Sequence, residues 1–300
     1  MNDDLIETFQ LDSSNLRGRI LRLGPALDSL LKRHSSYPDP VTRLTGETAC
    51  IALMMSSMLK YDGIFTLQLQ GDGPVSMVVA DIVNQGVMRA CAKYKESGEE
   101  IFSVSNPLLL MGKGHLVFTV DQGEDMERYQ GIVALNGKNF QALIQHYFAQ
   151  SEQIAAGIRF AMDKTSDGSW RAGAIMLQRL PEQKENSGEA EEDDWRRAMT
   201  LLHSCADKEL LDPNLPHNDL LFRLFHEEGV RVYDPVPVQD KCRCSQERAE
   251  NILHMISSAE RQDMAIEGKI IVTCEFCNRQ YGFDARDLEE KIQDGQTVHS

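Results

Sequence analysis

The sequence predicts an α+β fold in three parts: an N-terminal core domain with a largely antiparallel sheet plus helices, a helical linker region, and a small C-terminal domain. Several short segments alternate apolar and polar residues and are separated by glycine turns, as in antiparallel strands. An acidic, apolar-poor stretch interrupts the chain after residue 181. Two closely spaced cysteine pairs follow near the C-terminal end.

Residues 1–181 are predicted to form the α+β core domain. The clearest signal is a hairpin at residues 64–70 and 75–80, where the period is two and the turn is Gly-Asp-Gly-Pro. Residues 37–40, Tyr-Pro-Asp-Pro, are expected to be a loop. Further strands are predicted at residues 16–23, 108–111, 115–120, 130–135 and 171–180, and helices at residues 25–34, 49–60 and 139–156.

Residues 182–234 are predicted to be an acidic segment and a helical linker. Residues 182–194 are expected to be a linker or a solvated excursion, and Asp193 or Asp194 is expected to cap a helix that carries Trp195. A second short helix should start at Asn218 or Asp219 and end at Gly229. Helices shorter than about 12 residues are marginal in water, so these must pack on another part of the protein. Conditional folding and an ordinary helical subdomain both remain open.

Residues 235–300 are predicted to form the C-terminal domain. Ser245 should cap a helix over residues 246–256, and Ser258 a helix from residue 259. Strands are expected at residues 269–273 and 280–283, before a last helix capped by Asp284 that runs through residue 292.

The charge balance excludes some classes of partner. Thirty-one Lys and Arg against forty-six Asp and Glu give a net charge of −15, which is the wrong sign for holding a nucleic acid backbone. The N-terminus, Met-Asn-Asp-Asp, is acidic where a secretory signal is basic, and the longest apolar run, residues 49–55, is far shorter than the ~18 residues of a membrane span. We expect a cytoplasmic protein with no nucleic acid and no membrane partner.

In the cytoplasm, clustered thiols bind metal or act as redox switches more often than they form structural disulfides. Cys50, Cys91 and Cys205 are scattered and are expected to be small core residues.

The other four are clustered as Cys242-Arg243-Cys244 and, after 29 residues, Cys274-Glu275-Phe276-Cys277. Four thiolates suit one tetrahedral Zn²⁺, so one zinc ion per chain is predicted. A thiolate is also a nucleophile toward oxidants, so the pairs could act as a switch. Spacing alone favours a permanent structural zinc, because closed Cys₄ sites are usually structural.

Several motifs in matching order carry a resemblance to a known family. The sequence resembles the redox-regulated heat shock protein 33 family, the 33-kDa bacterial chaperonins, over nearly its whole length. The matching stretches are residues 16–19 (Leu-Arg-Gly-Arg), 67–74 (Leu-Gln-Leu-Gln-Gly-Asp-Gly-Pro), 112–116 (Gly-Lys-Gly-His-Leu), 129–133 (Tyr-Gln-Gly-Ile-Val), 151–154 (Ser-Glu-Gln-Ile), 242–245 (Cys-Arg-Cys-Ser) and 274–278 (Cys-Glu-Phe-Cys-Asn).

The resemblance implies a chaperone rather than an enzyme: an ATP-independent holdase that binds unfolding client proteins and prevents their aggregation under oxidative stress. It implies that the reduced, zinc-loaded form is inactive. On activation, Cys242 would pair with Cys244 and Cys274 with Cys277, zinc would be released, and the C-terminal domain and linker would unfold. The activated form in this family is a homodimer.

Two other classes remain as alternatives. A constitutive zinc-binding adaptor or nucleic-acid-binding protein would keep a purely structural Cys₄ site, but residues 241–300 carry eight Lys and Arg against eleven Asp and Glu. A thiol oxidoreductase would use Cys274 and Cys277 catalytically, but the pair stands in a zinc-knuckle pattern rather than at a thioredoxin-like helix start.

Overall fold

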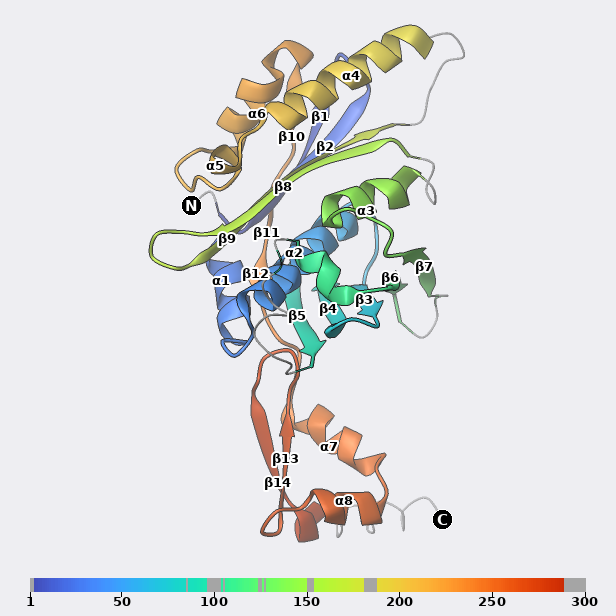
Figure 1. The fold of residues 1–300 in the computed structure, drawn as a ribbon, viewed down its shortest axis with the longest axis vertical. Helices are drawn as coiled ribbons and strands as arrows, with labels where there is room; N and C mark the ends of the chain where they lie inside the picture. Colours follow the sequence, from blue (N-terminus) through green and yellow to red (C-terminus); the bar gives the residue numbers. More distant parts are fainter. Residues whose placement is uncertain are drawn as a thin grey trace. The chain divides into compact units, whose positions relative to one another are not determined.

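The computed structural model describes residues 3–288 apart from residues 85, 96–103, 105, 124, 125, 127, 150–153 and 181–187. The chain divides into two compact units, Met1–Lys241 and Cys242–Ser300. Both combine helices and strands (Figure 1), which confirms the predicted α+β class. None of the helices in the described ranges is long and apolar enough to cross a bilayer.

The first unit contains two mainly antiparallel sheets. Sheet A runs in the order β10-β1-β2-β9-β8, and β11 also pairs with β1. Its strands are β1 Leu5–Leu11, β2 Leu16–Leu23, β8 Ala156–Lys164, β9 Trp170–Arg179, β10 Val230–Val232 and β11 Val236–Pro237.

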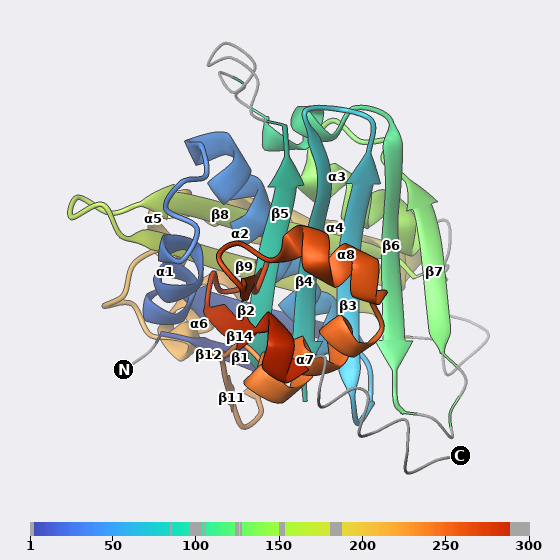
Figure 2. The ribbon, with the colours of Figure 1, turned by 90° about the horizontal axis from the view of Figure 1, so that it is seen from below.

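Sheet B runs in the order β12-β5-β4-β3-β6-β7, and its longer strands lie side by side in Figure 2. Only the β12–β5 pair is parallel among its described pairs. Its strands are β3 Ile64–Gly71, β4 Val75–Val83, β5 Val87–Tyr94, β6 Gly114–Asp121, β7 Tyr129–Ala134 and β12 Gln239–Asp240.

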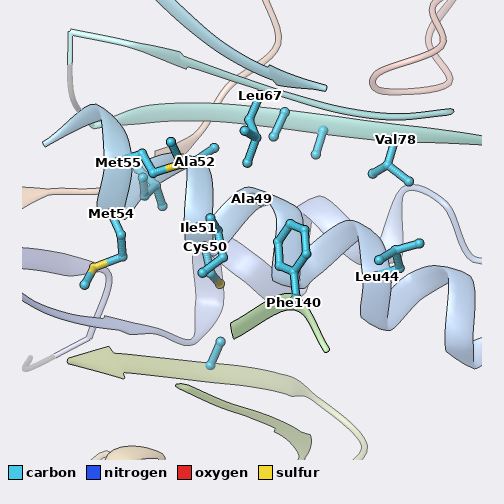
Figure 3. Packing of buried hydrophobic residues seen from close by; sticks show 14 of the residues in the cluster. Leu44, Ala49, Cys50, Ile51, Ala52, Met54, Met55, Leu67, Val78 and Phe140 are labelled. Carbon is cyan, nitrogen blue, oxygen red and sulfur yellow. The ribbon is translucent and has the colours of Figure 1, made fainter. Parts of the chain in front are cut away.

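Helix α2, Asp39–Ser56, lies between the two sheets (Figure 1) and contacts β3, β4 and β5 of sheet B and β2, β8 and β9 of sheet A. Its side chains are therefore buried around almost the whole helix, and they form much of the main core (Figure 3). The hydroxyls of Thr45 and Thr48 donate to the carbonyls one turn earlier, at 2.8 and 2.7 Å, so both polar groups are satisfied inside this core. Helices α1, Pro25–Lys32, and α3, Phe140–Tyr147, lie beside α2 in this layer.

The opposite face of sheet A is covered by residues 188–228, which we call the helical segment (Figure 1). It consists of α4 Gly188–Ser204, α5 Asp207–Leu210, α6 His217–Phe225 and the 3₁₀ turn η4 His226–Glu228. A second apolar cluster joins it to the sheet: Phe9 of β1 stacks on Phe225 of α6, with ring centroids 6.0 Å apart. Gly18 makes room for Phe9, because a Cβ at position 18 would lie 2.0 Å from that ring. The short linker helices thus obtain their packing partner from sheet A.

The second unit has a small core of its own. It contains α7 Gln246–His254, α8 Ser258–Met264 and the hairpin of β13 Lys269–Thr273 and β14 Gln280–Asp284. Its buried apolar residues within the described range are Ala249, Leu253, Ile270, Phe283 and Leu288. Ser245 caps α7 as predicted, since its hydroxyl accepts from the Arg248 N–H at 3.2 Å.

Several sequence predictions are wrong in detail. Residues 108–111 are not a strand but part of the 3₁₀ helix η2 Pro107–Met111, because Pro107 opens it and the Asn106 side chain caps it. The helix predicted over residues 49–60 spans residues 39–56 instead. Half of the predicted 37–40 loop is therefore helical, because a proline such as Pro40 is compatible with the first turn of a helix. The helix predicted over residues 139–156 is shorter than expected: α3 ends at Tyr147, and Ala156 is the first residue of β8.

The capping predictions for the helical segment and the second unit also need correction. Asp193 and Asp194, one of which was expected to cap the first helix, instead lie inside α4, which begins at Gly188. Helix α6 begins at His217, just before the predicted start at Asn218 or Asp219. Ser257, rather than Ser258, caps α8 through a capping box with Glu260. The Asp284 carboxylate accepts from the Arg286 N–H at 2.9 Å, as predicted for a cap, whereas the predicted end of that helix at residue 292 lies outside the described residues.

Candidate metal centre

All four predicted ligand residues meet in the second unit. Cys242 and Cys244 lie on the extended stretch before α7, and Cys274 and Cys277 lie at the tip of the β13–β14 hairpin. Their sulfur atoms all lie within 4.8 Å of one another, an arrangement that could hold a metal ion.

The hairpin tip is a tight turn held by main-chain hydrogen bonds. The N–H groups of Cys277 and Asn278 donate to the Cys274 carbonyl at 3.2 and 2.8 Å, and the Cys274 N–H donates to the Arg279 carbonyl at 2.9 Å. Asn278 has a φ of 55°, in the left-handed region that asparagine tolerates better than most residues. This turn directs the two thiols of a Cys-x-x-Cys motif to one side.

The sulfur separations suit a tetrahedral cation. A Zn–S distance of about 2.3 Å places tetrahedral sulfurs about 3.8 Å apart. The Cys242 and Cys274 sulfurs are 3.7 Å apart, and the Cys244 and Cys277 sulfurs are 3.4 Å apart. A disulfide needs about 2.05 Å, so these are free thiols. The donor set therefore fits a soft cation such as Zn²⁺.

The four thiols also influence one another's ionisation. Burial raises the pKa of Cys242, but hydrogen bonds from the Cys244 main chain and the neighbouring thiols outweigh burial and lower its pKa to about 7. Burial raises the pKa of Cys274 and of Cys277, and in both a hydrogen bond with Cys242 adds to the increase. A central cation would favour the thiolate form of all four.

Two side chains of β14 and its turn support the thiols. The Tyr281 hydroxyl donates a hydrogen bond to the Cys244 sulfur at 3.1 Å. The pKa of Arg279 is raised, first by its hydrogen bond with Tyr281 and also by the charges of Cys244 and Cys277. The sequence reasoning missed both residues. A lone tyrosine 37 positions from Cys244 carries no local signal of this contact.

The remaining three cysteines are buried in the first unit, as predicted for small core residues. Cys50 is 0%, Cys91 6% and Cys205 1% exposed. Burial raises the pKa of Cys50 and of Cys205, which keeps both thiols protonated.

Comparison with known proteins identifies the family. The family model described as Hsp33 protein matches residues 4–284. The chain belongs to the Hsp33 family. It is 38% identical over 292 residues to the 33 kDa chaperonin of Caulobacter vibrioides, covering 94% of this chain and 95% of that protein. It is 35% identical over 288 residues to the 33 kDa chaperonin of Escherichia coli, covering 96% and 94%.

A solved structure shows the same fold. The crystal structure of the 33 kDa chaperonin (heat shock protein 33 homolog) from Thermotoga maritima aligns with a TM-score of 0.80 and 23% identity, covering 98% of this chain and 99% of that one. The resemblance stated from the sequence motifs is thereby confirmed, and the chain is an Hsp33-type chaperonin.

Proposed function

We propose that this Hsp33-type chaperonin is a redox-regulated, ATP-independent holdase and not an enzyme. In the reduced form Cys242, Cys244, Cys274 and Cys277 hold one Zn²⁺, and client binding is suppressed. Oxidation converts the thiols to disulfides, the C-terminal domain and the helical segment unfold, and the protein binds unfolding clients in the cytoplasm as a homodimer. The observation that carries the proposal is the cluster of four reduced thiols within 4.8 Å in a member of this family.

The small core of the second unit supports a dependence on metal. Five buried apolar residues in its described part are too few to stabilise a domain of about 60 residues without a staple such as a metal ion. Bound Zn²⁺ supplies a positive charge that stabilises four thiolates and links the hairpin tip to the stretch before α7. This unit is therefore expected to unfold when its thiols are oxidised.

The thiol chemistry balances with peroxide as the oxidant. The pairs we propose are Cys242 with Cys244 and Cys274 with Cys277. In each pair, one thiolate attacks peroxide and becomes a sulfenic acid, and the second sulfur displaces hydroxide to form the S–S bond. Each pair of thiolates gives up two electrons, and with two protons taken from the solvent the peroxide is reduced to two water molecules. Each disulfide removes two thiolates from the ligand set.

The path from the metal centre to the helical segment follows the chain. Residues 230–241 connect η4 to Cys242 and add the short strands β10, β11 and β12 to the two sheets. Strands of two or three residues have few hydrogen bonds and low local stability. Unfolding that starts at Cys242 can therefore spread through them to α6 and α4.

The client surface that we propose is the face of sheet A beneath the helical segment. It carries Phe9, Ile20, Ile175 and Leu177, each at most 1% exposed while the segment is docked. Release of α4 and α6 would expose these side chains as a continuous apolar patch, which is typical of protein-binding surfaces.

The test compares reduced and peroxide-treated protein in the same assay. A guanidinium-unfolded, aggregation-prone enzyme is diluted into each sample, light scattering reports aggregation, and a chelating dye reports zinc. We expect about one zinc per chain to be released, together with suppression of aggregation in the oxidised sample alone. Peptide mapping of the oxidised protein tests the two disulfides. Zinc that stays bound, or that leaves without suppression, would instead favour a constitutive adaptor with a structural Cys₄ site.

A further inference from the structure

Three arginines of sheet A hold one stretch of the helical segment through its main chain. Arg22 of β2 donates from Nε to the Leu210 carbonyl at 3.0 Å, from Nη2 to the Glu209 carbonyl at 3.3 Å, and from Nη1 to the Leu215 carbonyl. Five carbonyls within eleven residues accept hydrogen bonds from these arginines, and they belong to Cys205, Glu209, Leu210, Leu211 and Leu215.

The other two arginines come from neighbouring strands. Arg171 of β9 donates from Nε to the Leu211 carbonyl, and Arg159 of β8 donates from Nε to the Cys205 carbonyl, both at 2.9 Å. We call Arg22, Arg159 and Arg171 the carbonyl-binding arginines. In the sheet register, Arg22 lies opposite Gly173 of β9, and Arg159 lies opposite Ile175 of β9. Arg171 lies on β9 itself, two residues before Gly173, so its side chain is on the same face. Because successive side chains of a strand lie on opposite faces of the sheet, all three arginines lie on the face of sheet A that carries the second apolar cluster.

The main chain of the stretch lies directly against the sheet at this point. A Cβ at Gly173 would meet the Leu210 carbonyl oxygen at 2.6 Å, so only glycine permits this approach. Arg22 is 1% exposed, and the hydrogen bonds that it donates to described residues all go to main-chain carbonyls. A buried guanidinium must be hydrogen-bonded, because burying the charge without partners is strongly unfavourable.

Arg159 also donates from Nη2 to the Asp207 carboxylate, but the five carbonyl hydrogen bonds do not depend on the side chains of residues 205–215, since every polypeptide offers carbonyl groups. A binder of unfolded proteins needs such sequence-independent contacts. When the helical segment leaves, the guanidinium of Arg22 loses acceptors on a face that also carries apolar residues such as Ile20 and Ile175. An unfolded chain can supply both carbonyl oxygens and apolar side chains.

We propose that the carbonyl-binding arginines hold main-chain carbonyls of the unfolded client, so that residues 205–215 act in the closed form as an internal substitute for a client. The proposal rests on the holdase function and adds how the client main chain is recognised. It predicts that Arg22 has two opposing roles, because it holds the helical segment before activation and the client afterwards.

The first experiment uses the full chain after complete oxidation with peroxide. The probe is fluorescein-labelled, reduced and carboxymethylated α-lactalbumin, which is permanently unfolded, and anisotropy gives its Kd. Arg22→Lys keeps the charge but loses the planar fork of donors, and we expect a Kd about tenfold higher than for the wild type. The same variant should need less oxidant for release of the segment.

Arg179→Lys is the matched control. Arg179 of β9 also contacts the helical segment, but through the Glu192 carboxylate at 3.0 Å and not through a carbonyl. Its Kd should stay within about twofold of the wild type. An unchanged or lower Kd for Arg22→Lys, or an equal loss in Arg179→Lys, would overturn the proposal. Failure of the oxidised wild type itself to bind the probe would refute the holdase function, and the inference with it.

A second measurement needs no variant and therefore no assumption about folding. A peptide with the sequence of residues 206–215, amidated at its C-terminus so that Leu215 keeps an amide carbonyl, should displace the probe from the oxidised wild type. A second peptide carries thioamides at Leu210 and Leu215, so that two carbonyl oxygens become sulfur, a poorer acceptor. We expect at least fivefold weaker competition from the thioamide peptide, and equal competition would contradict recognition of carbonyls.

Discussion

Replacing Phe225 with alanine tests whether the helical segment, by its packing alone, keeps the client face closed. Phe225 is 0% exposed and stacks on Phe9 of sheet A, and it is surrounded by the second apolar cluster. The change removes a whole aromatic ring from the contact between α6 and the sheet. It leaves the cysteines of the second unit untouched.

The expected cost follows from the complete burial of the ring. Truncation of a buried Phe to Ala costs about 3–5 kcal/mol. All of this loss favours the open state, because Phe225 leaves the sheet when the segment is released. Since 1.4 kcal/mol corresponds to a factor of ten, the open population should rise at least about a hundredfold.

The assay is carried out on reduced, zinc-loaded protein. Amide hydrogen exchange should accelerate in α4 and α6, and the variant should suppress aggregation of an unfolded enzyme without any oxidant. Zinc should remain bound. Phe222→Ala is the matched control, because Phe222 lies on the same helix and is 66% exposed. The control should change stability by less than about 0.5 kcal/mol.

Two results would refute this reasoning. If exchange in α6 does not accelerate, then Phe225 does not determine docking of the segment. If exchange accelerates and aggregation is still not suppressed, then the uncovered face of sheet A is not the client surface.

Three further predictions concern single groups. Tyr281→Phe removes the hydrogen bond to the Cys244 sulfur, so zinc affinity should fall about 10- to 100-fold, as measured by competition with a chelating dye. Tyr233→Phe is the control: it removes a hydroxyl that donates to the Gln10 side chain, and zinc affinity should stay unchanged. Burial raises the pKa of Glu47 from 4.5 to about 7. The folded state thus binds this proton more tightly than the unfolded state, and the resulting stability is present below about pH 4.5 and lost as pH rises through 7. In denaturant titrations, the free energy of unfolding of the wild type should fall by between about 2 and 3 kcal/mol from pH 5 to pH 8, relative to Glu47→Gln. Parallel pH profiles of the two proteins would contradict this prediction. Cys205 should resist alkylation by iodoacetamide in the reduced protein and react after oxidation, while Cys50 in the main core should stay protected in both states. Peptide mass spectrometry measures the alkylation of each cysteine. Equal protection of Cys205 in both states would argue against release of the helical segment.

Local patterns predicted the elements whose cause is local. The hairpin at residues 64–70 and 75–80 alternates cleanly between apolar and polar side chains, and it appears as β3 and β4. Strand β5, Val87–Tyr94, was missed because small residues such as Ala90 and Ala92 occupy its buried positions and weaken the apolar signal. Strand β1 was missed although its alternation is visible, and it proves to be a central member of sheet A.

By itself, the sequence determined the family and the four thiols that could bind a metal, because motif order and cysteine spacing are properties of the chain. Only the tertiary structure decided what surrounds them. The contact of Tyr281 with Cys244 spans 37 positions, and that of Arg22 with the Leu215 carbonyl spans 193. An arginine in a strand has no pattern that reveals a main-chain carbonyl as its partner, since every residue offers one. Such pairings arise only when packing of the helical segment on sheet A brings distant parts of the chain together.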